Sequence, residues 1–416
     1  MKAKILGFLA FSILYINAKA QLNQRFDNTN YKAIYFSEAC KLIAANPDLL
    51  LLDVRSPGEY ADTGKSVSYN IGRLNGAVNL TIDSVPAHIK DLEQYKDKTI
   101  LVYCSHSQRS RIVSKYLGDN GFKNVYSLNG GMTQVNKTAI AGFPCKSSLY
   151  TSNLPYKFVG PDDAVALIKD RNTVIMDVRT PTEFNIRDTS EYKNVGRIRG
   201  AVNVPLNTID KQITLLAKYV DKPILIYDLF GQDGIEAAIK LTNAGFTKVN
   251  VLFEGINTFF ANTSTSDTKR DLLIASPAYK LIGVRETVDL VNANPNLIIA
   301  DFRPKQEFEN KSGNNFSNLG HIKNAVNFNS VDDLEAYLKD KPKTLPILIY
   351  SSFSASMKGM AGMANTDLSK VSRQLSIEGY TVYLLYSGLY SVVWASANVE
   401  SCKDAASILV DHQGFY

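Results

Sequence analysis

A motif that recurs twice at a constant spacing constrains the fold of this chain more than any other feature. Residues 53–60 read DVRSPGEY, residues 177–184 read DVRTPTEF and residues 301–308 read DFRPKQEF, so each copy starts 124 residues after the one before. A unit of this length can bury a core of its own, unlike the short units that must stack on their neighbours. The sequence therefore predicts three tandem domains of one fold.

Two further motifs return in the same order in each copy, which supports the repeat. A glycine-led motif is followed by an apolar run that ends in a polar residue or cysteine. The glycine-led motif occupies residues 72–79, 196–203 and 320–327. The apolar run occupies residues 100–104, 224–228 and 347–351. With 416 residues and 45% hydrophobic content, the chain is long enough for several cores.

Short apolar stretches alternate with longer amphipathic ones within each copy. This order favours an α/β fold in which a parallel sheet has helices on both faces. Ser37 is a plausible N-cap for an opening helix. In the first copy we expect strands at 49–53, 77–80, 99–103 and 125–128, and helices at 85–95, 110–120 and 132–139.

The repeat also sets the expected domain boundaries. We place the three domains at residues 31–146, 155–262 and 277–400, and a tail at 401–416. The polar, Ser/Thr/Pro-bearing segments 147–155 and 262–277 are the expected linkers.

The N-terminus has the pattern of a cleavable signal peptide at residues 1–20. Lys2 and Lys4 precede an apolar run, and a small-residue motif ends at Ala20, which predicts cleavage before Gln21. A membrane anchor is disfavoured, because spanning a bilayer takes about 20 apolar residues and this run is shorter. We therefore expect an exported protein, periplasmic or secreted, that does not associate with a membrane after cleavage.

The charge of the mature chain argues against nucleic acid as a partner. Lys2, Lys4 and Lys19 supply three of the six net positive charges, so removal of residues 1–20 leaves +3. The remaining basic residues alternate with acidic ones, whereas binding to a phosphate polymer calls for a concentrated basic stripe.

The four cysteines are too few and too scattered for a disulfide framework or a metal site, and no CxxC is present. We expect neither a metal nor a cofactor. If Cys104 stays free, the other three, Cys40, Cys145 and Cys402, allow one bridge at most, and the sequence does not say which pair would form it. Cys40 and Cys145 are best interpreted as small buried hydrophobes.

Cys104 lies where ligands bind in parallel α/β sheets, directly after a strand and before a helix. The loop 104–110 can curl so that its N–H groups point inward, and the N-terminus of the following helix adds partial positive charge. Arg109 supplies a fixed fork of donors. These features predict an anion cradle that favours thiolate over thiol at Cys104.

The order of these motifs resembles that of the rhodanese family from about Tyr31 to Val399, in three copies. The resemblance implies that Cys104 takes the outer sulfur of thiosulfate or a similar small donor as a persulfide and passes it to cyanide or a thiol. It also implies that the loop binds the sulfonate oxygens, with Arg109 as counter-charge. The loop residues concerned are Ser105, His106, Ser107, Gln108, Arg109 and Ser110.

Two features of the first copy depart from the family pattern. Ser107 stands where the family has a loop glycine, so a positive φ at this position would strain the loop or change its shape. Residues 61–71 lengthen the segment before the glycine motif, and we expect a surface excursion there. Phosphatases of the same fold have five residues between cysteine and arginine, whereas four separate Cys104 from Arg109, which favours sulfur transfer.

Asp53, Arg55 and Glu59 recur in copies without the cysteine, so we interpret them as structural. We expect an ion pair between Arg55 and Glu59 that ties the end of the first strand to the following loop. His106 is expected to face solvent, since a thiolate placed in this way needs no base.

The second and third copies have lost the residues that sulfur transfer needs. The second has Asp228 and Asp233 at the cysteine and arginine positions, and two carboxylates would repel an anion. The third has Ser351 and an insertion at Met357–Asn365. The sequence thus favours an exported sulfurtransferase acting through the first domain. The alternative is a non-catalytic binding or scaffold protein, and in either case the second and third domains are candidates for contacting a protein partner.

Overall fold

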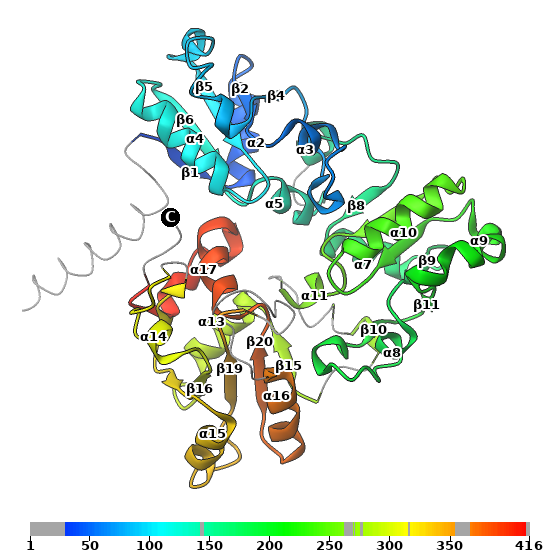
Figure 1. The fold of residues 1–416 in the computed structure, drawn as a ribbon, viewed down its shortest axis with the longest axis vertical. Helices are drawn as coiled ribbons and strands as arrows, with labels where there is room; N and C mark the ends of the chain where they lie inside the picture. The colour runs from blue at the N-terminus through cyan, green and yellow to red at the C-terminus, as the bar shows by residue number, and fades with distance from the viewer. Residues whose placement is uncertain are drawn as a thin grey trace, which may run out of the picture. The chain divides into compact units, whose positions relative to one another are not determined.

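The computed structural model describes residues 30–141, 145–261, 269, 271–274, 278–314, 317–353 and 367–412. Residues 1–20, the expected signal peptide, and the insertion Met357–Asn365 lie outside this part. Within it, no helix has the length and apolar character needed to cross a bilayer. The described chain contains three five-stranded parallel sheets, one for each repeat (Figure 1).

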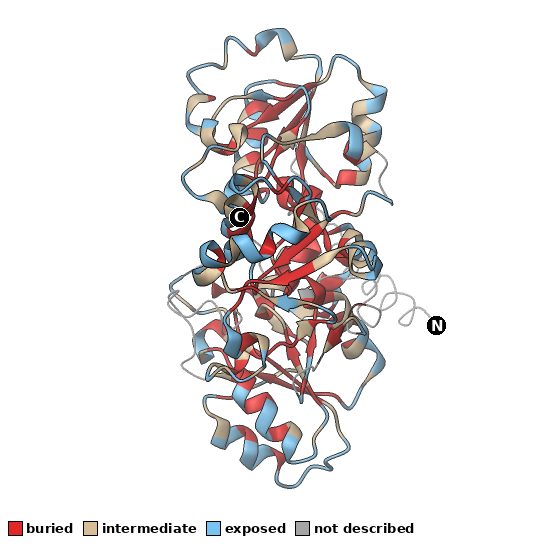
Figure 2. Cartoon of the chain, turned by 90° about the vertical axis from the view of Figure 1, so that its right-hand side faces the viewer, coloured by how far each residue is buried: buried red, intermediate tan, exposed pale blue. Residues whose placement is uncertain are grey.

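The sheet of the first domain has the strand order β1-β6-β5-β2-β4, with every neighbouring pair parallel. Its central strands are buried along their length except at Thr99, as expected for a sheet covered on both faces (Figure 2). The strands are β1 Lys32–Ile34, β2 Leu50–Asp53, β4 Val78–Asn79, β5 Thr99–Tyr103 and β6 Asn124–Leu128. The predicted strands are confirmed to within two residues, and β1 is an addition.

Alternate residues of each strand face opposite helical layers. Leu52 and Val102 pack in one cluster with Leu117 of helix α4. The intervening residues, such as Leu101, lie on the other face and are also buried. The helices of the domain are α2 Phe36–Ala45, α3 Pro57–Ala61, α4 Gln108–Asp119 and α5 Gly131–Lys137.

Three details of the first domain differ from the sequence prediction. The helix expected at 85–95 is wrong. Short 3₁₀ helices, Ile82–Ser84 and Glu93–Tyr95, flank or end this segment, and most of its backbone hydrogen bonds join residues three apart. The reason is that Pro86, near its start, has no N–H to donate. Helix α2 starts one residue before Ser37, and the N–H of its N-cap, Tyr35, donates to the Glu38 carboxylate at 2.9 Å. Helix α4 starts at Gln108, two residues early, which places Arg109 in its first turn.

A two-stranded antiparallel ribbon closes each domain and was not predicted. Residues 147–152 of the expected linker 147–155 belong to the first compact unit instead, because they hold the end of helix α6 (Cys145–Leu149) and strand β7. Likewise, residues 401–410 of the expected tail pack Cys402 and Ile408 into the core of the third domain. The ribbons pair β3 Arg73–Leu74 with β7 Tyr150–Thr151, β10 Arg197–Ile198 with β14 Leu273–Ile274, and β17 His321–Ile322 with β21 Leu409–Val410.

The second domain repeats the topology of the first, with the strand order β11-β9-β12-β13-β8. Its strands are β8 Lys157–Val159, β9 Val174–Asp177, β11 Val202–Asn203, β12 Ile224–Tyr227 and β13 Val249–Leu252. Its helices are α7 Pro161–Lys169, α8 Pro181–Phe184, α9 Ile209–Leu216, α10 Gln232–Asn243 and α11 Thr258–Ala261.

The third domain has the order β15-β20-β19-β16-β18, which is again the same topology. Its strands are β15 Lys280–Ile282, β16 Ile298–Asp301, β18 Val326–Asn327, β19 Ile347–Tyr350 and β20 Val382–Leu385. Its helices are α13 Val284–Ala293, α14 Lys305–Phe308, α15 Val331–Leu338, α16 Leu368–Ile377 and α17 Gly388–Asn398.

The second and third domains together form one compact unit, and the first domain makes up most of another. Within the second unit, one hydrophobic cluster runs from Phe259 of the second domain to Leu384 of the third. An ion pair between Glu191 and Arg373, 3.0 Å apart, also links the two domains. The second and third domains therefore share a core.

Candidate active site

Cys104 follows the last residue of β5 at the carboxyl edge of the first sheet, as the sequence predicts. Residues 99–103 are apolar or β-branched and form a central strand, and α4 starts only four residues after Cys104. The intervening loop therefore turns sharply over the N-terminus of α4. Helix N-termini present unpaired N–H groups and partial positive charge, and anions commonly bind at such positions.

The side chain of Cys104 lies inside this turn. Its Sγ accepts the backbone N–H of Ser107 at 3.2 Å and lies 3.8 Å from the Ser110 hydroxyl. The Ser110 hydroxyl in turn donates to the Ser107 carbonyl and lies 3.0 Å from the Ser127 hydroxyl. Cys104 is 1% exposed. The sulfur thus accepts one backbone N–H at the N-terminus of α4 and lies within contact of one hydroxyl.

Ser107 adopts the positive φ that the family glycine would supply. Its φ is 90°, and Gly231, 124 residues later, has φ 95° in the second domain. A left-handed conformation costs a non-glycine residue about 1–2 kcal/mol. The Ser107 hydroxyl accepts the Gly130 N–H at 2.5 Å, and a hydrogen bond of this kind offsets about 1 kcal/mol. The loop therefore keeps the turn despite the serine.

The start of α5 supports the same loop from behind. Gly131 has φ 52° and passes so close to the Cys104 carbonyl that a Cβ there would overlap it. The next two N–H groups, of Met132 and Thr133, donate to the carbonyls of Cys104 and Ser105 at 2.9 and 3.0 Å. This glycine is required by a close backbone approach.

Arg109 is paired with Glu59 rather than left free for a substrate. Its two terminal nitrogens donate to the two carboxylate oxygens at 2.7 Å each, and one also donates to the Ser105 hydroxyl at 2.9 Å. Burial by itself would raise the pKa of the Glu59 carboxyl, but the hydrogen bonds from Arg109 and Ser56 lower it to about 2. Glu59 therefore already neutralises much of the charge of Arg109, and the expected role of Arg109 as counter-charge to a bound sulfonate stays a prediction.

The predicted ion pair between Arg55 and Glu59 does not form. Arg55 instead contacts Asp53 at 2.7 Å and donates to the Gly72 carbonyl at 2.8 Å. The same buried pair recurs in the other domains, between Asp177 and Arg179 and between Asp301 and Arg303. These residues are structural, as predicted, but the partner differs because Arg55 folds back on its own strand.

The exposed side of the loop carries His106 and Gln108, both solvent-exposed as expected for His106. The ring of Tyr69 lies edge-on to His106, with ring centroids 6.3 Å apart. Tyr69 belongs to the extra stretch 61–71, which thus reaches the edge of the site. No pattern in the sequence indicates this contact, because the two residues are distant along the chain.

In the second domain, the loop that corresponds to residues 104–110 binds a carboxylate of the chain itself. Asp228 is buried and accepts the N–H groups of Gly231 and Asp233 at 2.6 and 3.0 Å. Burial, with the nearby Asp233 charge, raises its pKa to about 6. An anion from solution would have to displace this carboxylate, in agreement with the predicted loss of anion binding.

The corresponding loop of the third domain has neither thiol nor arginine among its described residues. The Ser352 hydroxyl donates to Glu307, the counterpart of Glu59, at 2.7 Å. Burial raises the pKa of the Glu307 carboxyl. Over the whole described part of the chain, no three His, Cys, Asp or Glu side chains gather as a metal site.

Cys40 and Cys145 form a disulfide, with their Cα atoms 6.1 Å apart. Their interpretation as small buried hydrophobes is therefore wrong. The bridge joins α2 to the start of α6, a helix that the sequence analysis did not predict. Cys104 and Cys402 are free and buried, and burial raises the pKa of the Cys402 thiol to about 11.

Comparison with known proteins agrees with the repeat. A family model described as a rhodanese-like domain matches residues 37–138, 160–262 and 284–393. Curated proteins with similar sequence include the tRNA uridine(34) hydroxylases of Photorhabdus laumondii, 28% identical over 142 residues, and of Pectobacterium carotovorum, 27% identical over 139 residues. These matches cover 33% and 32% of this chain and 35% and 34% of those proteins, so the chain spans about a third of their length.

Solved structures that resemble parts of the chain include two of related type. A thiosulfate sulfurtransferase from Pseudomonas aeruginosa is 16% identical with a TM-score of 0.22, over 85% of this chain and 66% of that one. A rhodanese-like domain protein from Staphylococcus aureus is 24% identical with a TM-score of 0.21, over 24% of this chain and 87% of that one.

Proposed function

The chain belongs to the rhodanese-like domain family, and from this premise we propose that its first domain is a sulfurtransferase that carries sulfur as a persulfide on Cys104. The observation that carries the proposal is the placement of Sγ. It accepts the Ser107 N–H at 3.2 Å at the N-terminus of α4, which is the setting of a nucleophilic thiolate.

The proposed reaction has two displacement steps at sulfur. The Cys104 thiolate attacks the outer sulfur of thiosulfate, so that a new S–S bond forms as the bond to the sulfonate sulfur breaks and sulfite leaves with the electron pair. Cyanide or a thiolate then attacks the outer persulfide sulfur and restores the Cys104 thiolate. Neither step needs a metal or an external oxidant.

Binding of the donor rests on N–H groups rather than on a free cation. Glu59 neutralises Arg109, so the loop amides and the N-terminus of α4 provide the positive potential for the sulfonate. Cys104 is buried beneath the loop. A small donor such as thiosulfate suits this arrangement better than a bulky one.

We also propose that the protein works outside the cytoplasm, in the periplasm or after secretion. The N-terminal signal-peptide pattern supports this location, and so does the bridge between Cys40 and Cys145, because disulfides persist in oxidising compartments. The tRNA named in the curated relatives is not adopted as a substrate, because those matches span about a third of each protein and the mature chain carries a net charge of only +3.

The test is thiocyanate formation from thiosulfate and cyanide by the mature protein. We expect turnover by the unmodified chain, its loss in Cys104→Ser, and its retention in Cys402→Ser, which removes the other free thiol. Equal, near-zero rates for the unmodified chain and Cys104→Ser would overturn the proposal.

That negative result would favour the second candidate, a non-catalytic binding protein. The deep burial of Cys104 and the engagement of Arg109 by Glu59 are the observations on its side. Hydrolysis of a phosphate ester is disfavoured, because the loop has four residues between Cys104 and Arg109 and Glu59 already occupies the guanidinium that would bind phosphate.

A further inference from the structure

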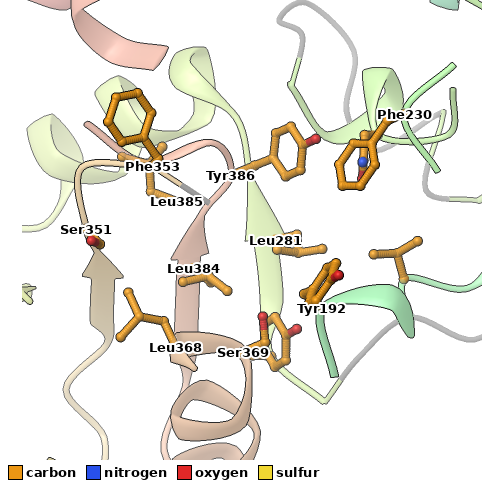
Figure 3. Close-up of a pocket in the computed structure, with 13 residues that line it drawn as sticks. Tyr192, Phe230, Leu281, Ser351, Phe353, Leu368, Ser369, Leu384, Leu385 and Tyr386 are labelled. Carbon is orange, nitrogen blue, oxygen red and sulfur yellow. The ribbon is translucent and has the colours of Figure 1, made fainter. Parts of the chain in front are cut away.

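A pocket lies inside the second compact unit, where the second and third domains share their core (Figure 3). Tyr192 and Phe230 line it from the second domain, and Ser351, Leu368 and Leu384 line it from the third. An ion pair between Glu191, which precedes Tyr192, and Arg373 of α16 joins the two domains beside the pocket.

Both degenerate loops contribute to this one pocket. Phe230 lies 124 residues after His106, and so holds the corresponding position in the loop of the second domain. Ser351 stands at the nucleophile position of the third domain, and Phe353 follows it by two residues, as His106 follows Cys104. His106 of the first domain's loop is thus replaced by a phenylalanine in both of the other domains.

The chemistry of the lining excludes a charged ligand and provides one polar anchor. The lining residues are aliphatic, aromatic or uncharged polar, with no Asp, Glu, Lys or Arg among them. Asn257 lies in this lining and is 4% exposed, and its Nδ2 has no hydrogen-bond partner within the described residues. A buried donor without a partner costs about 1–3 kcal/mol, which an acceptor on a ligand would recover.

We infer that this pocket binds a small uncharged molecule that has an apolar or aromatic body and an oxygen acceptor for Asn257. The pocket is open on one side and has a volume of about 40 Å³. Only the acceptor end of the ligand therefore lies within it, and the apolar body lies at the mouth, beside Phe230, which is 43% exposed. This binding function does not depend on Cys104 or on the proposed sulfur transfer.

Three probes of similar size separate the features of the inference. Acetophenone has a ring and a carbonyl acceptor, ethylbenzene lacks the acceptor, and benzoate carries a charge. Their affinities for the mature full-length chain are measured by ligand-observed NMR titration. We expect acetophenone to bind several-fold more tightly than ethylbenzene, and benzoate to bind most weakly.

Substitutions in the lining then assign the contacts. Asn257→Leu keeps the number and branching of the side-chain heavy atoms and removes the donor, so it should weaken acetophenone about tenfold, the effect of one hydrogen bond, and affect ethylbenzene much less. Phe230→Ala should weaken both neutral probes, and its exposed side chain can be truncated without loss of core. Tyr337→Ala removes an aromatic of similar exposure outside the pocket and should change neither affinity.

Three results would overturn the inference. They are no binding of acetophenone up to its solubility, binding of benzoate as tight as that of acetophenone, and acetophenone affinity unchanged in both Asn257→Leu and Phe230→Ala. Because Cys104→Ser leaves this pocket intact, the same titration on that variant separates failure of the pocket from failure of the proposed sulfur transfer.

Discussion

The pair between Glu59 and Arg109 should stabilise the first domain in a pH-dependent way. The pKa of Glu59 is lowered from 4.5 to about 2 in the folded domain, which corresponds to about 3 kcal/mol of stability at neutral pH. Since Arg109 is 30% exposed and partly screened, we expect about 2–3 kcal/mol. Because the folded pKa is the lower one, this stability is present above pH 4.5 and is lost as the pH falls towards 2.

Glu59→Gln tests this value through hydrogen exchange in the mature chain. At neutral pH the β5 amides of the variant should exchange about 30- to 150-fold faster than those of the unmodified chain, and the ratio should shrink as the pH is lowered below about 4.5. Glu183→Gln is the matched control. Glu183 holds the corresponding position in the second domain, but it pairs with Lys193 at 3.4 Å and, within the described part of the chain, accepts no pair of hydrogen bonds from an arginine. A ratio near one, or one that stays constant down to about pH 3, would refute the reasoning.

Further predictions concern backbone, charge and covalent structure. Gly131→Ala should destabilise the first domain by about 3 kcal/mol or more, because its Cβ meets a loop carbonyl, whereas Gly76→Ala, which has open space, should cost only about 1 kcal/mol in urea unfolding. The folded pKa of Asp228, about 6, lies above its ordinary 3.8, so the second domain should lose stability as the pH rises through this range, and Asp228→Asn should abolish that dependence. Reduction of the bridge between Cys40 and Cys145 should lower the first domain's stability by about 2–4 kcal/mol, measured by the same exchange.

The sequence predicted the sheets, because their strands are short apolar runs and the repeat shows them three times. It also placed Cys104 between β5 and α4, since that position follows from the order of strand and helix alone. The helix expected at 85–95 failed, because its apolar spacing was weighed without the missing N–H of Pro86.

What the sequence missed depends on contacts between distant segments. The partner of Arg109 is Glu59, 50 residues away, and a charge pattern along the chain does not specify which of several acids will meet an arginine. The closing ribbons are two residues long, too short for a period to be recognised. The sequence likewise did not indicate that Cys40 pairs with Cys145, because the two cysteines lie 105 residues apart along the chain.

The most direct test of the central claim is the intact mass of the mature protein after treatment with thiosulfate. We predict that Cys104 gains the mass of one sulfur atom, that cyanide removes it, and that Cys104→Ser gains nothing while Cys402→Ser behaves as the unmodified chain. An unmodified Cys104 after this treatment, or an equal mass gain in Cys104→Ser, would contradict the account.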